Sequence, residues 1–149
     1  MNDEILKQMM ESLIPFNKFL GMRVLTIERD RGFVRMEIPF RDELVGDPQR
    51  PALHGGVLSA LADTAGGLAV WSKVFDERSR VSTIDLRVDY LRPGRLETLV
   101  AEALVVRLGN RVGVADVRLF HPGKPDETVA TGKGVYNVTQ VKSAAPGGP

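Results

Sequence analysis

The sequence predicts an α+β fold in which a curved antiparallel sheet wraps around one long central helix. Two stretches of alternating apolar and polar residues come first, one long and almost uniformly apolar stretch follows, and four more strand-like stretches complete the pattern. Short pairs that contain glycine or proline separate these last four stretches. An order of two strands, one helix and four strands is typical of a sheet that packs one face against a single helix.

The first forty residues predict a helix and a hairpin. Residues 3–14 carry apolar side chains at helical spacing and Pro15 ends this pattern, so we expect a short amphipathic helix that packs over the fold as a lid. Residues 22–28 and 33–40 alternate between apolar and polar side chains. The residues between them end in Gly32, which favours a tight turn and hence two paired strands.

The middle of the chain predicts an irregular loop and then a long buried helix. Residues 42–53 include one glycine and two prolines, which interrupt regular structure. Residues 55–75 are apolar nearly all round, as in a helix about 30 Å long inside a core. Gly66 and Gly67 lie within this helix, where each glycine is less favourable than alanine by about 1 kcal/mol. We therefore expect the sheet to approach the helix backbone closely at these two positions.

Four further strands are expected at residues 80–92, 96–107, 111–120 and 128–138. From residue 84 to residue 90 the first of them alternates strictly, with apolar side chains at the even positions, which predicts one buried and one polar face. One helix cannot cover the whole of such a sheet. We therefore expect a second subunit over the exposed part, in a homodimer or a homotetramer.

Composition and charge favour a single globular domain. With 149 residues, 43% of them hydrophobic, we expect one domain over residues 1–140 and a disordered tail over residues 141–149. The formal net charge is +1, so no global field recruits nucleic acid or a membrane surface. The chain contains no cysteine, which excludes disulfides and thiolate nucleophiles. Its first ten residues lack a signal-peptide pattern, and the cytoplasm is the expected compartment.

One acidic residue, Asp63, lies about two turns inside the apolar helix. A charge at this position argues against a bilayer span. Desolvation makes a carboxylate a stronger base, which suits a general base or a nucleophile. The helix begins at Gly55, where an unpaired backbone N–H and the positive end of the helix dipole can stabilise an oxyanion. The alternative interpretation is that Asp63 is a structural residue that bridges two parts of the fold.

The stretch LHGGVLSALADTAGG, residues 53–67, resembles the start of the central helix in hotdog-fold acyl-CoA thioesterases of the phenylacetate-pathway (PaaI-like) branch. In these enzymes a His-Gly-Gly sequence opens the helix and an aspartate follows nine residues after the histidine. The matching residues here are His54, Gly55, Gly56 and Asp63. The resemblance implies a hotdog fold and hydrolysis of an acyl-CoA thioester, without a cofactor, in a site that spans two subunits.

The resemblance also implies a role for each site residue. The Gly55 amide would polarise the thioester carbonyl, while Asp63 of the neighbouring subunit would attack it or activate water. Thr83 matches the serine or threonine that assists the carboxylate from the strand after the helix. His54 could act as a base, but its place at a loop-to-helix junction favours a residue that positions or caps the helix start. The residues implied to contact substrate or CoA are Gly56, Thr64, Arg92, Pro93, Asn110 and Arg111, with the two arginines as candidate phosphate partners.

One position departs from the pattern of this family. Many relatives carry an asparagine six residues before the histidine, whereas this chain has Asp47 seven residues before it. Asp47 is expected to replace that asparagine, with Gln49 as the alternative. An ionised carboxylate cannot donate a hydrogen bond, so this departure alters how the position could orient water or the substrate carbonyl.

Other features of the sequence bear on the alternatives. His54 and His121 lack the spacing of metal ligands, and Trp71 and the methionines are expected in the core. Hotdog hydratases and dehydratases that act on enoyl or hydroxyacyl thioesters use a histidine followed by a Pro-Gly stretch, which is missing around His54. A non-catalytic acyl-CoA-binding domain is the other alternative, although no attached DNA-binding segment is recognisable. The sequence does not identify the acyl group.

Overall fold

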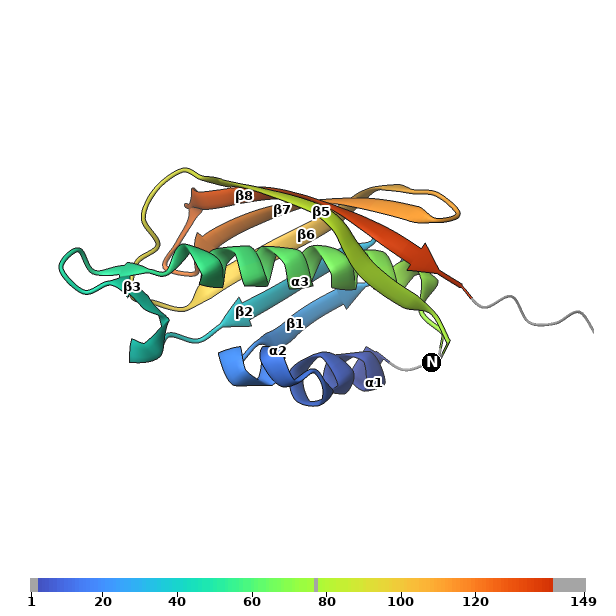
Figure 1. Ribbon diagram of the computed structural model, residues 1–149, viewed down its shortest axis with the longest axis horizontal. Coiled ribbons are helices and arrows are strands. Elements are labelled where there is room, and N and C mark those ends of the chain that lie inside the picture. Colours follow the sequence, from blue (N-terminus) through green and yellow to red (C-terminus); the bar gives the residue numbers. More distant parts are fainter. Residues whose placement is uncertain (1–2, 77, 141–149) are drawn as a thin grey trace, which may run out of the picture.

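The computed structural model describes residues 3–76 and 78–140 and has the predicted α+β architecture. Six antiparallel strands form one curved sheet in the order β1-β2-β6-β7-β8-β5, and the long helix α3, Gly55–Val74, lies along one face of it (Figure 1). The strands are β1 Arg23–Glu28, β2 Phe33–Ile38, β5 Arg80–Tyr90, β6 Leu99–Leu108, β7 Val112–His121 and β8 Lys124–Thr139. The strand that follows α3 therefore pairs with the last strand of the chain and forms one edge of the sheet.

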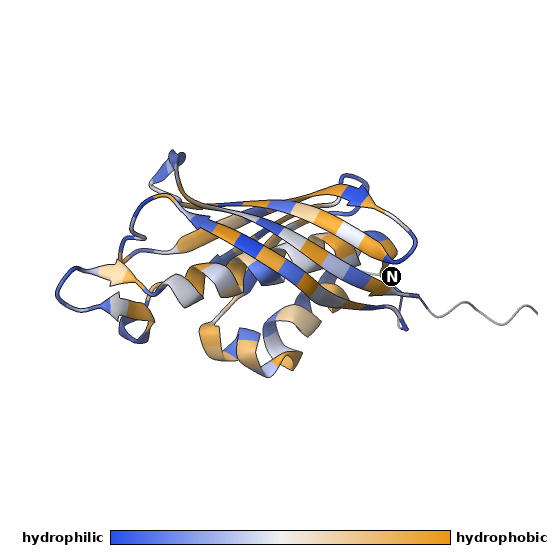
Figure 2. Cartoon of the chain, turned by 45° about the horizontal axis from the view of Figure 1, so that its top comes forward, coloured by the Kyte–Doolittle hydropathy of each residue, from blue (hydrophilic) through white to orange (hydrophobic). Residues whose placement is uncertain are grey.

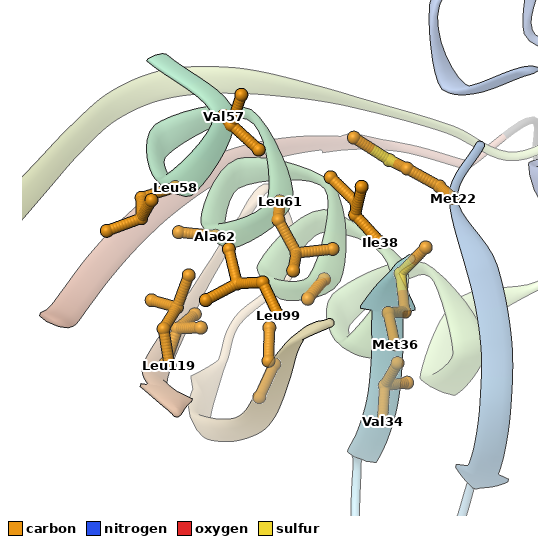
Figure 3. Close-up of a cluster of buried hydrophobic side chains, with 14 of the residues drawn as sticks. Met22, Val34, Met36, Ile38, Val57, Leu58, Leu61, Ala62, Leu99 and Leu119 are labelled. Carbon is orange, nitrogen blue, oxygen red and sulfur yellow. The ribbon is translucent and has the colours of Figure 1, made fainter. Parts of the chain in front are cut away.

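Helix α3 supplies the centre of the core. Its apolar side chains, among them Leu58 and Leu61, meet side chains from β2, β6 and β7, so that helix and sheet share one cluster (Figure 3). Leu61 is fully buried, as are Ala62 and Ala65 on the same helix. Small side chains at these positions let the sheet lie close to the helix. The prediction of a long buried helix over residues 55–75 is confirmed to within one residue.

Tyr136 on β8 explains the two glycines inside α3. The tyrosine is only 1% exposed and packs against Gly66 and Gly67 of the helix and against Gly134 of its own strand. A Cβ atom at Gly66 would overlap the Tyr136 hydroxyl, and one at Gly67 would lie 3.3 Å from the ring. The expected close approach of sheet and helix is thus confirmed, and the neighbour is one aromatic side chain.

The N-terminal segment differs from the single predicted helix. It consists of α1 Asp3–Gln8, a π-helical turn η1 Met9–Leu13 and α2 Pro15–Leu20. Pro15 interrupts the first helical pattern as expected, but it also begins α2, because the first turn of a helix does not need its N–H. The buried Asn17 donates a hydrogen bond from Nδ2 to the main-chain oxygen of Met10 at 3.0 Å and so ties α2 to the π turn.

Strand β5 does not bury its apolar residues as predicted. Ile84 is 57% exposed and Tyr90 is 52% exposed, while the two apolar residues between them are half-buried. A bulge between Thr83 and Asp85 interrupts the pairing with β8 and breaks the strict alternation. Because β5 is an edge strand, its other side pairs with none of the described strands (Figure 2).

Several boundaries differ from the sequence-based expectation. The predicted loop over residues 42–53 contains a 3₁₀ turn η2 Asp42–Leu44 and a small hairpin of β3 Val45–Asp47 and β4 Ala52–Leu53. Strand β6 begins three residues later than expected, and β8 begins four residues earlier. The predicted tail, residues 141–149, lies outside the described residues. Within the part of the chain that is described, no helix is long and apolar enough to cross a membrane.

Candidate active site

Asp63 lies on α3 beside a largely apolar pocket of about 240 Å³. Thr83 on β5 donates a hydrogen bond from Oγ1 to Oδ1 of Asp63 at 2.7 Å, so the structure brings these two predicted residues together. Thr64 lines the same pocket. Asp63 is half-buried, which leaves its carboxylate accessible, and the described residues supply no hydrogen-bond donor to its second oxygen. A carboxylate held in this way can accept a proton or attack an electrophile from the pocket.

The start of α3 presents one occupied and one available amide. The Gly56 N–H donates to Nδ1 of His54 at 2.8 Å, so the histidine side chain caps the helix. This bond assigns the hydrogen of a neutral His54 ring to Nε2. Among the described residues, none accepts a hydrogen bond from the Gly55 N–H. Of the two glycine amides, that of Gly55 is therefore the one open to an external oxygen.

Tyr90 at the end of β5 fixes the first peptide of α3. Its hydroxyl donates to the main-chain oxygen of Gly55 at 3.0 Å and also contacts the hydroxyl of Ser59, one turn further along the helix. The ring packs over Gly55, where an added Cβ atom would lie 3.4 Å away. An aromatic residue from the edge strand thus holds the Gly55–Gly56 peptide, which directly follows the available Gly55 amide.

Gly55 and Asp63 are too far apart to act on one carbonyl group within a protomer. Eight residues separate them, which is about 12 Å along a helix. A reacting oxygen must lie about 3 Å from its donor, and a nucleophile about 3.5 Å from the carbon it attacks. The start of the helix and Asp63 also border different pockets. His54 and Gly56 line a second pocket of about 250 Å³, which Phe16 of α2 borders.

Tyr136 of β8 contacts the backbone of Asp63. Its hydroxyl donates to the main-chain oxygen of Asp63 at 2.9 Å, and its ring lines the same pocket as the carboxylate. Burial and the negative charge of Asp63 raise the pKa of Tyr136, and the backbone N–H of Gly67 acts in the opposite direction. The phenol is therefore a protonated donor throughout the neutral range. Sequence reasoning missed this residue, and the only signal for it was the glycine pair in the helix.

Asp47 forms the turn between β3 and β4. Its Oδ1 accepts the backbone N–H groups of Gln49 at 2.9 Å and Arg50 at 3.2 Å. The turn lies close to the helix start, because a Cβ atom at Gly46 would lie 2.6 Å from the main chain of His54. The observed contacts of Asp47 are thus those of a turn-forming acceptor, and Gln49 is exposed beside it.

The arginines implied to bind CoA, and the residues beside them, contact β8 at two positions far apart along the strand. The backbone N–H of Arg92, which precedes Pro93, donates to the oxygen of Val129, while the N–H of Val138 donates to the oxygen of Arg111. Nine residues of strand separate these contacts, or roughly 30 Å. Within one protomer the two groups do not come together.

The two arginines also differ in their electrostatic surroundings. The guanidinium of Arg92 lies 2.6 Å from Glu127, and this hydrogen bond lowers the pKa of the Glu127 carboxyl. Arg111 is exposed, borders an open polar pocket of about 750 Å³ with Asn110, and has no acidic partner among the described residues. Arg111 is therefore the arginine with an uncommitted charge.

His121 is a structural residue of the fold. It is 1% exposed; its Nδ1 donates to the main-chain oxygen of Thr98, and its Nε2 accepts the N–H of Arg95, both at 2.9 Å. The ring holds the connection between β5 and β6, and neither nitrogen is free to bind a ligand.

Comparison with known proteins decides the family. The model of the thioesterase superfamily matches residues 51–127, which include Gly55, Asp63 and Thr83. The chain belongs to the thioesterase superfamily. This thioesterase is 37% identical to the medium/long-chain acyl-CoA thioesterase YigI of Escherichia coli K12, over 72% of this chain and 76% of YigI.

Solved structures agree with this assignment. A Shewanella oneidensis protein related to the thioesterase superfamily is 30% identical with a TM-score of 0.79, over 90% of this chain and 93% of that one. The Escherichia coli PaaI protein from the phenylacetic acid degradation operon is 27% identical with a TM-score of 0.70, over 83% of each chain. The predicted hotdog fold, the PaaI-like type and the enzyme class, a thioesterase that hydrolyses thioesters, are therefore confirmed.

Proposed function

We propose that this thioesterase hydrolyses acyl-CoA, with Asp63 as the nucleophile or general base and the Gly55 amide as the oxyanion donor. The observation that supports this most directly is the Asp63 carboxylate, which Thr83 holds beside an apolar pocket. YigI is named as a medium/long-chain acyl-CoA thioesterase, and its similarity supports a substrate of this class. The cytoplasm is the proposed compartment and residues 1–140 the proposed domain.

The reaction needs a carboxylate and an oxyanion donor on either side of one carbonyl group. The thioester oxygen would accept the Gly55 N–H as negative charge develops on it. Asp63 would attack the carbonyl carbon and form an anhydride that water then cleaves, or it would take a proton from the attacking water. In both routes the C–S bond breaks, the thiolate of CoA leaves and takes up a proton, and the free acid is the other product.

The 12 Å between Gly55 and Asp63 points to a site shared by two subunits. The edge strand β5 supplies a route to such a dimer, because its unpaired side is free to pair with β5 of a second copy. It also exposes Ile84 and Tyr90, which a partner would cover. Thr83 lies on the same strand, so the pairing would bring the Asp63 side of one protomer near the helix start of the other. A homotetramer would add a second contact between such dimers.

The separated CoA candidates fit the same arrangement. In a two-subunit site, Arg92 and Pro93 would come from the protomer that supplies Gly55, and Asn110 and Arg111 from another protomer. Gly56 and Thr64 would lie near the thioester. Asp47 would orient the loop before His54 through its turn, and Gln49 could reach the site from the same turn.

Thiol release tests the proposed function. Purified protein is assayed against short, medium, long and aromatic acyl-CoAs, with Asp63→Asn as an isosteric control that removes the charge. We expect hydrolysis by the wild type, and loss of hydrolysis in the variant with fold and oligomer size unchanged. A wild type that binds acyl-CoA but hydrolyses none of the panel would refute the proposal and favour the binding or dehydratase alternatives. A fully active Asp63→Asn variant would refute the role of Asp63.

Mixed oligomers test the shared site. Gly55→Pro removes the amide donor, and proline is tolerated at the first position of a helix, where Gly55 lies. Each variant alone, Gly55→Pro or Asp63→Asn, is expected to be inactive. Refolded together in equal amounts, they should recover about a quarter of the wild-type activity, because half of the dimers would hold one intact site out of two. No recovery would mean that both groups must come from one chain.

A further inference from the structure

The pocket beside Asp63 runs along one face of α3 toward Trp71. The helix residues that line it are Asp63, Thr64, Gly67, Leu68 and Trp71, which share a face at the helical repeat. Met10 and Ile14 of the N-terminal segment and Val81 of β5 complete its apolar walls. The lining thus combines polar groups at the carboxylate with hydrocarbon and aromatic surface, and Asn17 of α2 also borders the pocket.

Trp71 is held firmly at the far end of this lining. Its indole Nε1–H donates to Oγ of the fully buried Ser79 at 2.8 Å. The same Ser79 hydroxyl donates to the main-chain oxygen of Asp76, so the loop between α3 and β5 fixes the indole. Phe75 packs edge-on against Trp71, with ring centroids 5.0 Å apart and an interplanar angle of 81°. Rotation of the indole away from the pocket would break these contacts.

Two independent measures give the length of chain that the pocket holds. Asp63 and Trp71 are eight residues apart on the helix, or about 12 Å. Carbon–carbon bonds of about 1.5 Å at tetrahedral angles advance an extended chain by roughly 1.25 Å per atom, so this distance holds nine or ten carbons. If each chain atom takes roughly 30 Å³, the volume of one water molecule in the liquid, the pocket of about 240 Å³ holds about eight atoms.

We propose that this pocket binds the acyl chain and that Trp71 limits its length, which makes medium-chain acyl groups of about eight to ten carbons the best substrates. The inference rests on the proposed acyl-CoA hydrolysis at Asp63. Shorter chains leave apolar wall uncovered and lose binding energy in proportion. Longer chains meet the fixed indole and must bend out of the pocket. The structure thus assigns to Trp71 a role in specificity that its partial burial in the core does not reveal.

A chain-length profile tests the role of Trp71. The ratio of kcat/KM for palmitoyl-CoA to that for octanoyl-CoA is measured in the wild type, in Trp71→Leu and in Trp71→Phe. Because each ratio is taken within one preparation, a loss of folded protein cancels. We expect the ratio to rise about tenfold in Trp71→Leu and less in Trp71→Phe, since a few methylene groups in an apolar pocket contribute differences of this size. Trp71→Phe keeps an aromatic ring, and its ratio tests the inference if the leucine variant does not fold.

Phe75→Leu is the matched control. Phe75 packs against Trp71 but does not line the pocket, and the hydrogen bond to Ser79 still holds the indole in the variant, so it should keep the wild-type ratio. An unchanged ratio in both Trp71 variants, or an equal rise in Phe75→Leu, would overturn the inference while leaving thioester hydrolysis intact. A wild type that hydrolyses no acyl-CoA would instead overturn the proposed function, and the inference with it.

Discussion

The phenol oxygen of Tyr136 lies 2.9 Å from the main-chain oxygen of Asp63 and donates a hydrogen bond to it. Asp63 is thus held by two hydrogen bonds, one from Thr83 to its carboxylate and one from Tyr136 to its main-chain oxygen. Tyr136→Phe should lower the free energy of unfolding by about 1 kcal/mol. It should also reduce kcat several-fold with KM unchanged, because the carboxylate is less well positioned. Denaturation and steady-state kinetics measure the two effects, and an unchanged kcat would limit this bond to a structural role.

The raised pKa of Tyr136 should make the free energy of unfolding depend on pH in alkali. Burial and the charge of Asp63 raise the pKa of Tyr136 in the folded state above the ordinary value of 10.0. The folded state then holds this proton more tightly than the unfolded state does. Its contribution to stability is complete below pH 10 and is lost as the pH rises above that value. Denaturation from pH 8 to pH 11 should show a downward slope near the upper end that is smaller in Tyr136→Phe.

Gly66→Ala should destabilise the protein although alanine favours helices. The change gains about 1 kcal/mol in helix propensity. The added Cβ would overlap the Tyr136 hydroxyl, so we expect a net loss of about 1–3 kcal/mol in thermal or chemical unfolding. Gly67→Ala is the control, because its Cβ would lie 3.3 Å from the ring and should be less harmful. Combination with Tyr136→Phe should relieve part of the loss, and strict additivity would contradict this explanation.

Gly55→Pro should reduce kcat by about 10²–10³-fold if the Gly55 amide stabilises the oxyanion. Gly55→Ala keeps the amide, and its Cβ would make an ordinary contact with Tyr90, so this variant should retain most of the activity. Circular dichroism checks that α3 is intact in both. Equal activity of the two variants would show that another group binds the oxyanion.

Arg111→Ala should raise the KM for acyl-CoA more than Arg92→Ala does. Arg92 forms a salt bridge with Glu127 that partly neutralises its charge, whereas Arg111 has no acidic partner among the described residues. We expect a rise of about twofold to fivefold for Arg111→Ala, the size of one exposed charge contact. The corresponding acyl-pantetheine, which lacks the nucleotide, serves as the control substrate. A KM effect that persists with acyl-pantetheine would rule out a contact to the CoA phosphates.

The sequence predicted what depends on local pattern. Helix α3 was placed to within one residue because glycines open it and its apolar run is long. The link between Asp63 and Thr83 was also anticipated, although it came from the family resemblance and not from spacing. Glycine and proline located the turns between the last strands, since these residues act on their own backbone.

Features that depend on distant parts of the chain were missed. The bulge at Ile84 arises from pairing with β8, and alternation within β5 contains no trace of it. Tyr136 lies 73 positions after Asp63, so no local pattern could join them. Trp71 was assigned to the core because an apolar helix does not show which of its side chains border a cavity.

The close contacts of Tyr136 with Gly66, Gly67 and Gly134 should couple these four positions in evolution. A side chain at Gly66 or Gly134 would overlap Tyr136, so it is less destabilising once the residue at position 136 has become smaller or has lost its hydroxyl. Once the ring has shrunk, helix propensity would favour replacement of both helix glycines. Descendants of this sequence should therefore change these positions together, in an order that begins with the tyrosine, and intermediates with the reverse order should be rare.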